Sequence, residues 1–154
     1  MASEFQPSDR NFAARVQDSF LRQRAMQLIG ARMIRIEPGL VQIELPYRDD
    51  LTQQHGYFHG GFTSAIADSA GGYAGYSLFP AESSVLTVEF KINLLAPAKG
   101  ERLVATGRVL KPGRTLTVCE LSVAAVEQGR ETACAHGLQT LICLQGQSDF
   151  RQPA

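Results

Sequence analysis

The chain has 154 residues, of which 15 are basic and 15 acidic, so its formal net charge is zero. A balanced charge excludes the broad positive field that favours nucleic acid or an anionic membrane surface. With 44% hydrophobic and 19% charged residues, the length predicts one globular domain over residues 1–154 with a buried core.

The first dozen residues contain no apolar segment of the kind found in secretory signals, and no apolar run approaches the roughly 20 residues of a membrane span. We therefore expect a soluble cytoplasmic protein with neither a membrane nor a nucleic-acid partner. The cysteines fall in apolar segments without zinc-ligand spacing, which predicts buried reduced thiols at Cys119, Cys134 and Cys143. His55 and His136 also lack neighbours at ligand spacing, so no metal site is expected.

The predicted elements begin with a helix. Apolar residues recur at a helical spacing from residue 11, and Gly30 supplies a stop, so the N-terminal helix is expected over about 11–30. Two β-prone runs follow, 31–36 and 40–45, on either side of Glu37-Pro38-Gly39. Proline and glycine supply turn backbone angles, so this pair predicts a hairpin.

A second, apolar helix is predicted over about 60–78, closed by Pro80. It contains Gly71, Gly72 and Gly75, each of which costs about 1 kcal/mol relative to alanine in a helix interior. Because glycine lets backbones approach closely, we expect this helix to be enclosed by a curved sheet or to face a second helix.

Residues 85–94 alternate strictly, which predicts a strand with Leu86, Val88 and Phe90 on its apolar face and Thr87 on its polar face. Three further strands are expected at 102–110, 115–126 and 131–144. Short Pro- or Gly-containing turns at 96–100, 111–114 and 127–130 join all four strands, which predicts an antiparallel meander that begins with the strand at 85–94. A tail over 146–154 ends the chain. The element order indicates an α+β hotdog fold, with about six antiparallel strands wrapped around the long central helix.

The segment from Gln53 to Asp68 carries the candidate chemistry. His59-Gly60-Gly61 opens the central helix, whose N-terminal N–H groups suit an oxygen that becomes an oxyanion. Two turns later Asp68 is the only acidic residue between Asp50 and Glu82. A carboxylate on a largely buried helix must be paired, capped, protonated or functional, because burying it alone is costly.

This pattern resembles that of the PaaI-type hotdog acyl-CoA thioesterases of the phenylacetate pathway. The resemblance covers roughly residues 30–145 and rests on Gln53, His59-Gly60-Gly61 and Asp68, then Leu95-Ala96-Pro97-Ala98 and the turn at 111–115. It implies hydrolysis of an acyl-CoA thioester to a free acid and coenzyme A, with no metal or redox cofactor.

The same resemblance implies catalytic roles. Asp68 is expected to act as general base or as nucleophile, and Gln53 and the Gly60 N–H to polarise the thioester carbonyl. Thr87 is expected to assist the attacking water, and His59 to orient the loop rather than ionise.

Substrate contacts are expected from Gly61 and Phe62 beside the motif. Lys111 and Arg114, in the turn between two strands, are candidates for the phosphates of coenzyme A, although charged turn residues commonly only face water.

Gly60 and Asp68 lie eight positions apart in the sequence, or about 12 Å along a helix axis. General-base chemistry needs its carboxylate within about 3 Å of the reacting water. One helix therefore does not serve one substrate with both groups, whereas two antiparallel copies related by a two-fold axis do. We expect a homodimer, extended by the resemblance to a homotetramer.

Two alternatives stay open. A hotdog dehydratase or hydratase would favour a catalytic histidine with a carboxylate, and His59 is poorly placed for that role. A non-catalytic acyl-CoA sensor would keep the pocket without needing Asp68. The acyl group itself, aromatic or medium-chain, is not specified by the sequence.

Overall fold

The computed structural model describes residues 5–150; of the predicted tail, residues 151–154 lie outside this range. Within it no helix is long and apolar enough to cross a membrane. The elements in chain order are α1 (Phe12–Leu21), α2 (Arg24–Ile29), β1 (Arg32–Glu37), β2 (Leu40–Pro46), a short 3-10 turn (Asp49–Leu51), α3 (Gly60–Tyr76), β3 (Ser83–Leu94), β4 (Arg102–Lys111), β5 (Leu116–Glu127) and β6 (Arg130–Gln145).

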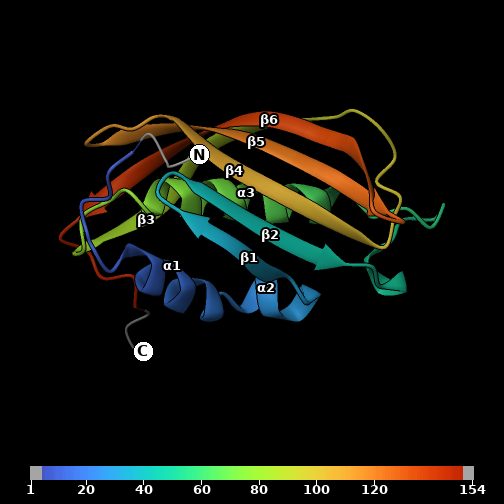
Figure 1. Ribbon diagram of the computed structural model, residues 1–154, viewed down its shortest axis with the longest axis horizontal. Helices are drawn as coiled ribbons and strands as arrows, with labels where there is room; N and C mark the ends of the chain where they lie inside the picture. Colours follow the sequence, from blue (N-terminus) through green and yellow to red (C-terminus); the bar gives the residue numbers. More distant parts are fainter. Residues whose placement is uncertain (1–4, 151–154) are drawn as a thin grey trace.

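The six strands form one antiparallel sheet in the order β1-β2-β4-β5-β6-β3. The sheet curves around α3, while α1 and α2 lie in line beside β1 (Figure 1). This arrangement confirms the predicted hotdog fold, and it makes β3 an edge strand.

The N-terminal helix predicted over 11–30 is two helices, because the chain leaves the helical conformation at Gln23. Gln23 is extended (φ −79°, ψ 91°), and its side-chain oxygen accepts a hydrogen bond from Ser69 Oγ on α3 at 2.9 Å. The break thus lets the N-terminal segment attach to the central helix, a contact that helical spacing does not encode. Gly30 ends α2 in the left-handed conformation (φ 78°), as its role as a stop predicts.

The predicted meander is correct for β4, β5 and β6 but wrong for β3, which pairs with β6 and not with β4. The segment between β3 and β4 connects the edge strand to a strand in the middle of the sheet, past β6 and β5. Pro97 in this segment has no N–H to give to a sheet ladder, while Ala98 O accepts from Phe58 N at 3.0 Å. The crossing therefore passes over the start of α3 and forms one wall of the cavity described below.

The strict alternation predicted for residues 85–94 is also wrong, because the register with β6 shifts between Thr87 and Glu89. Val88 is the extra residue of a β-bulge, and an extra residue exchanges the two faces of a strand. Before the bulge Val85 and Thr87 face α3; after it the inward residues are the apolar ones, and the residues that turn to the outer face are Glu89, Lys91 and Asn93.

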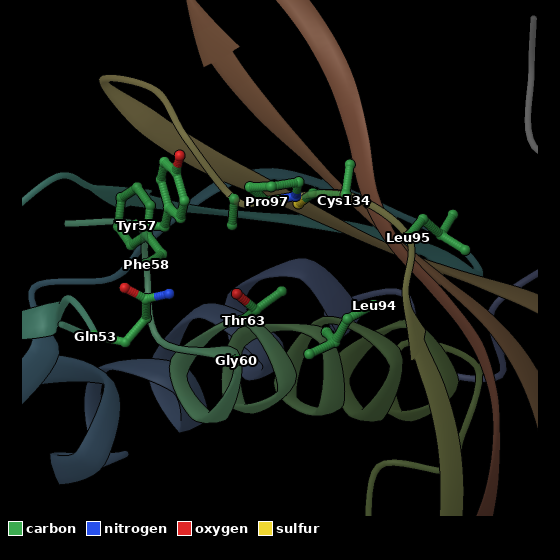
Figure 2. Close-up of a pocket in the computed structure, with 11 residues that line it drawn as sticks. Gln53, Tyr57, Phe58, Gly60, Thr63, Leu94, Leu95, Pro97 and Cys134 are labelled. Atoms are coloured by element: carbon green, nitrogen blue, oxygen red, sulfur yellow. The ribbon is translucent and has the colours of Figure 1, made fainter. Parts of the chain in front are cut away.

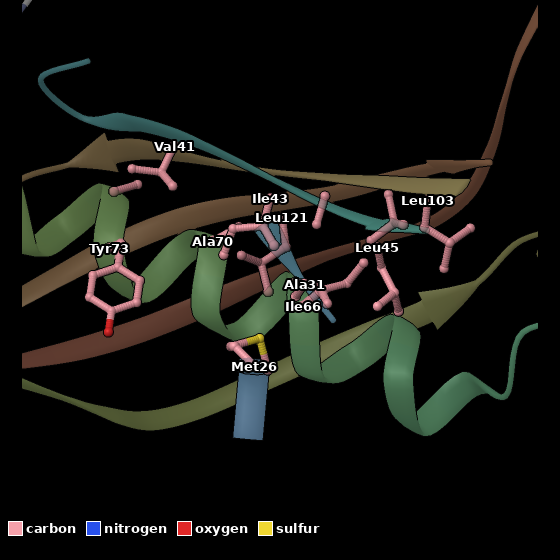
Figure 3. Packing of buried hydrophobic residues seen from close by; sticks show 14 of the residues in the cluster. Met26, Ala31, Val41, Ile43, Leu45, Ile66, Ala70, Tyr73, Leu103 and Leu121 are labelled. Carbon is pink, nitrogen blue, oxygen red and sulfur yellow. The ribbon is translucent and has the colours of Figure 1, made fainter. Parts of the chain in front are cut away.

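The core lies between α3 and the inner face of the sheet, where residues such as Ile43, Ile66 and Leu121 are fully buried (Figure 3). The three cysteines are free and buried, as predicted. Burial raises the pKa of Cys119 to about 12, so this thiol stays protonated.

The sheet explains two of the three glycines in the interior of α3, which are Gly71, Gly72 and Gly75. A Cβ at Gly71 would lie 1.9 Å from Gln139 Oε1, and a Cβ at Gly75 would lie 2.3 Å from Leu141 Cδ1, both on β6. A Cβ at Gly72 would meet nothing within 4 Å. The expected enclosure by a curved sheet is therefore confirmed for Gly71 and Gly75.

Candidate active site

The start of α3 is organised by His59. Its Nδ1 accepts a hydrogen bond from Gly61 N at 2.9 Å, so the imidazole serves as the N-cap of the helix. The N–H of Gly60 has no acceptor among residues 5–150. His59 thus occupies one of the two glycine N–H groups and leaves the other without an acceptor among residues 5–150.

A cavity of about 470 Å³ opens beside this N–H, lined by Gln53, Tyr57, Phe58, Gly60, Thr63, the segment 94–98 and Cys134. Figure 2 shows the cavity between the N-terminus of α3 and the segment that crosses from β3 to β4. The Gln53 side-chain oxygen accepts from the backbone N–H of His55, which directs the amide nitrogen toward the cavity. Gln53 and Gly60, predicted to polarise one carbonyl, therefore lie in one pocket.

Thr63 is a site residue that the sequence motif did not single out. It is buried, lines the same cavity, and its hydroxyl has no hydrogen-bond partner among the described residues. A hydroxyl in the first turn of a helix ordinarily bonds to the backbone. The sequence therefore contained no indication that the Thr63 hydroxyl would lack a partner among the described residues.

Asp68 lies in a second cavity, of about 290 Å³, between α3, α1 and β3. Its Oδ1 accepts from Thr87 Oγ1 at 2.7 Å and from Gln139 Nε2 at 2.6 Å, while no described residue donates to Oδ2. Nearby, Tyr73 forms a 3.1 Å hydrogen bond with Ser19. Burial raises the pKa of Tyr73 to about 12, so the phenol stays neutral.

The two cavities share no residue. In one chain Gln53 and Gly60 are therefore separate from Asp68 and Thr87, as the eight-residue interval along α3 predicts. Between them the two cavities, which we call half-sites, hold hydrogen-bond donors and a carboxylate, the kinds of group that hydrolysis of an acyl compound uses.

The four residues expected to bind substrate are not brought together in one chain. Gly61 is exposed, and Phe62 packs against the core with its ring 6.2 Å from that of His59. Lys111 is exposed at the end of β4, and Arg114 borders a third cavity near the C-terminal end of α3. None of the four lines the cavity with Gln53 or the cavity with Asp68.

Known proteins agree with this architecture. The family model of the thioesterase superfamily matches residues 55–133. A crystallised thioesterase family protein from Silicibacter pomeroyi is 49% identical, with a TM-score of 0.86 over 88% of this chain and 99% of that chain. Human acyl-coenzyme A thioesterase 13 is 30% identical over 109 residues, or 65% of this chain and 76% of the human protein.

The structure of E. coli PaaI, from the phenylacetic acid degradation operon, has a TM-score of 0.79 over 91% of this chain and 98% of that chain. Its sequence identity is 18%, so this likeness shows the shared fold alone. The fold and the family match define a hotdog hydrolase. The chain belongs to the thioesterase superfamily and is a thioester hydrolase.

Proposed function

We propose that the protein hydrolyses acyl-CoA thioesters in a PaaI-type manner, at two equivalent sites shared between the subunits of a homodimer. One observation carries the proposal: Gln53 and Gly60 lie in one cavity, while Asp68 lies in another cavity along the same helix. Within residues 5–150 neither the Gly60 N–H nor Asp68 Oδ2 has a hydrogen-bond partner. The name of the human relative supports coenzyme A as the thiol.

In this mechanism the Gln53 amide and the Gly60 N–H donate hydrogen bonds to the thioester carbonyl oxygen. Asp68 Oδ2 of the facing chain accepts a proton from a water whose oxygen attacks the thioester carbon. The tetrahedral intermediate then breaks its C–S bond, releasing the acid and the coenzyme A thiolate, which takes up a proton. Direct attack by Oδ2 would give an acyl-enzyme anhydride that water hydrolyses to the same products.

The exposed edge of the sheet supports the dimer. An unpaired strand edge is ordinarily protected by charge or by cover, yet several large apolar side chains of the β3 edge are 42–60% exposed: Leu86, Val88, Phe90, Leu94 and Leu95. Pairing with β3 of a second copy would bury them and satisfy the edge N–H and C=O groups. It would also set the two α3 helices antiparallel, so that Gly60 of each chain faces Asp68 of the other.

Lys111 and Arg114 remain the proposed contacts for coenzyme A phosphates, and Gly61 and Phe62 the proposed contacts near the thioester. Aromatic and medium-chain acyl groups are the proposed substrates, and the chemistry needs no metal or redox cofactor. Two dimers are proposed to form a tetramer.

The proposal is tested by thiol release from a panel of aromatic and aliphatic acyl-CoA thioesters, comparing the wild type with Asp68→Asn. We expect the variant to lose about a thousandfold in kcat, because its amide neither accepts the proton nor attacks, while it stays folded and oligomeric. If the wild type binds acyl-CoA tightly but does not hydrolyse it, the proposal is wrong and a non-catalytic acyl-CoA sensor is favoured. Full activity of Asp68→Asn would remove Asp68 from the mechanism.

A further inference from the structure

Gln139 is a buried polar residue that no sequence motif singled out and that lies outside the residues matched by the family model. It sits on β6, on the face of the sheet that covers α3, and is 1% exposed. Its neighbours across the sheet are Cys119 on β5 and Phe90 on β3. A primary amide in a core of aliphatic, aromatic and thiol groups calls for a physical reason.

The amide nitrogen of Gln139 meets three oxygens of the Asp68 half-site. Nε2 lies 2.6 Å from Asp68 Oδ1, 3.1 Å from the Asp68 backbone oxygen and 3.0 Å from Thr87 Oγ1. The reversed amide orientation would set Oε1 against a carboxylate and a carbonyl, so the contacts themselves fix which end is nitrogen. Thr87 gives its single proton to Asp68 Oδ1 and can therefore accept from Gln139.

The hydrogen bonds among Asp68, Thr87 and Gln139 distinguish the two carboxylate oxygens of Asp68. Oδ1 receives hydrogen bonds from the buried Gln139 amide and from the Thr87 hydroxyl on β3, whereas Oδ2 receives none from residues 5–150. Rotation of the carboxylate would break both bonds at once. The side chain is thus held in one orientation with a single free oxygen.

The other end of the amide lowers stability. Gln139 Oε1 is buried and has no hydrogen-bond partner among the described residues, and an unsatisfied buried acceptor is unfavourable. Methionine would fill similar space without that cost. Packing alone therefore does not account for glutamine at this position.

Gly71 makes the room for this amide. A Cβ at position 71 would lie 1.9 Å from Gln139 Oε1 and 3.1 Å from its Cδ. A glycine in a helix interior lowers helix propensity, and here it lies where the Gln139 amide contacts α3. Gly71, three positions after Asp68 on α3, therefore provides the space that the Gln139 amide occupies.

We propose that Gln139 is a positioning residue that holds Asp68 Oδ1 together with Thr87, so that Oδ2 alone is presented to the attacking water or the thioester carbon. The inference rests on the proposed function, in which Asp68 is the reacting carboxylate. Gln139 itself lines neither of the two half-site cavities.

The first test is Gln139→Met, which keeps the volume and removes the N–H donors. We expect kcat to fall about 10- to 100-fold, because a misplacement of about 1 Å in a reacting group lowers the rate by up to about 100-fold. KM should stay within about twofold of the wild type, since no substrate contact is lost, and the thermal midpoint should be unchanged or higher. A folded Gln139→Met dimer with wild-type kcat would overturn the proposal.

A second test uses a matched pair of helix variants. Gly71→Ala presses on Gln139 and on the aliphatic Leu121 of β5, whereas Gly75→Ala presses on the aliphatic Leu141, the next inward residue of β6. Gly71→Ala should lower kcat as Gln139→Met does, while Gly75→Ala should lower stability and keep kcat. Equal kcat losses in the two alanine variants would mark a general packing effect and contradict the positioning role.

Asp68→Asn separates this inference from the proposed function. Loss of hydrolysis in Asp68→Asn together with full kcat in Gln139→Met would overturn only the role of Gln139. A readout that needs no activity is the crystal structure of Gln139→Met, in which the Asp68 carboxylate should leave its wild-type orientation or become multiply placed. An unchanged, singly placed carboxylate would reject the inference even if no thioester is hydrolysed.

Discussion

At the scale of single residues, His59 acts on the backbone at the start of α3. Its Nδ1 accepts the hydrogen bond of Gly61 N–H, whereas the Gly60 N–H has no acceptor among residues 5–150. This use of Nδ1 as an acceptor places the ring proton on Nε2. The imidazole therefore acts on the proposed carbonyl site through the backbone that it fixes.

Removing this cap tests its role. His59→Ala should lower the free energy of unfolding by about 1 kcal/mol, since an uncapped helix start leaves an N–H without its acceptor. His59→Ser, whose hydroxyl also caps helices, should recover most of that loss in chemical denaturation. Equal stability of the serine and alanine variants would show that the cap contributes nothing.

Gln53 is predicted to act through its amide nitrogen, because its oxygen is occupied by the His55 N–H. Gln53→Glu removes the donor and sets a negative charge near the developing oxyanion, so kcat for acyl-CoA hydrolysis should fall about 100- to 1,000-fold. Gln54→Glu adds the same charge at an exposed neighbour outside the cavity and should keep kcat. Similar losses in both variants would point to long-range charge instead of a direct hydrogen bond.

At the scale of elements, the packing of α3 against the sheet depends on small residues on both sides. A Cβ on Gly107 of β4 would lie 2.3 Å from backbone atoms of Ala70 and Gly71. A backbone cannot rotate away as a side chain can, so the whole helix would have to shift. Gly107 therefore sets the distance between the sheet and the helix that carries the site.

Gly107→Ala should lower the free energy of unfolding by about 3 kcal/mol, the upper range for an overpacked core. Gly72→Ala is the contrasting change, because its Cβ would meet no atom of residues 5–150 within 4 Å. It should raise stability by about 1 kcal/mol through helix propensity alone. Thermal and urea denaturation of the two variants measure both effects, and a neutral Gly107→Ala would contradict the close approach.

The bulge at Val88 is the second decisive feature at this scale. It keeps Thr87 facing Asp68 while the apolar residues that follow also turn inward. Without it, either Thr87 or Phe90 would face outward, because alternate residues of a strand point to opposite faces.

At the scale of the whole molecule, the shared site is tested by mixing two inactive homodimers. Gln53→Glu disables one half-site and Asp68→Asn the other, so a heterodimer of the two contains one intact site. After subunit exchange at equal concentrations, half of the dimers are mixed and about one quarter of wild-type activity should return. No recovery, with exchange verified by mass spectrometry, would place both half-sites in the same chain.

What the sequence determined by itself is local. Periodicity, turn residues and the position of Pro80 located the second helix at 60–78 against an observed Gly60–Tyr76, and all six strands within two residues at either end. The motif placed Gln53 and Gly60 together because only a short loop separates them. Such patterns act over a few residues, where backbone geometry leaves few choices.

Only the tertiary structure decided how β3 lies at the sheet edge, where its bulge falls, and which groups surround Asp68. Thr87 and Gln139 are 19 and 71 positions from Asp68 in the chain, yet both bond to its Oδ1. Contacts of that separation depend on strand order and register, which local alternation leaves open. The buried amide of Gln139 and the glycine that makes room for it acquire meaning only when β6 is folded over α3.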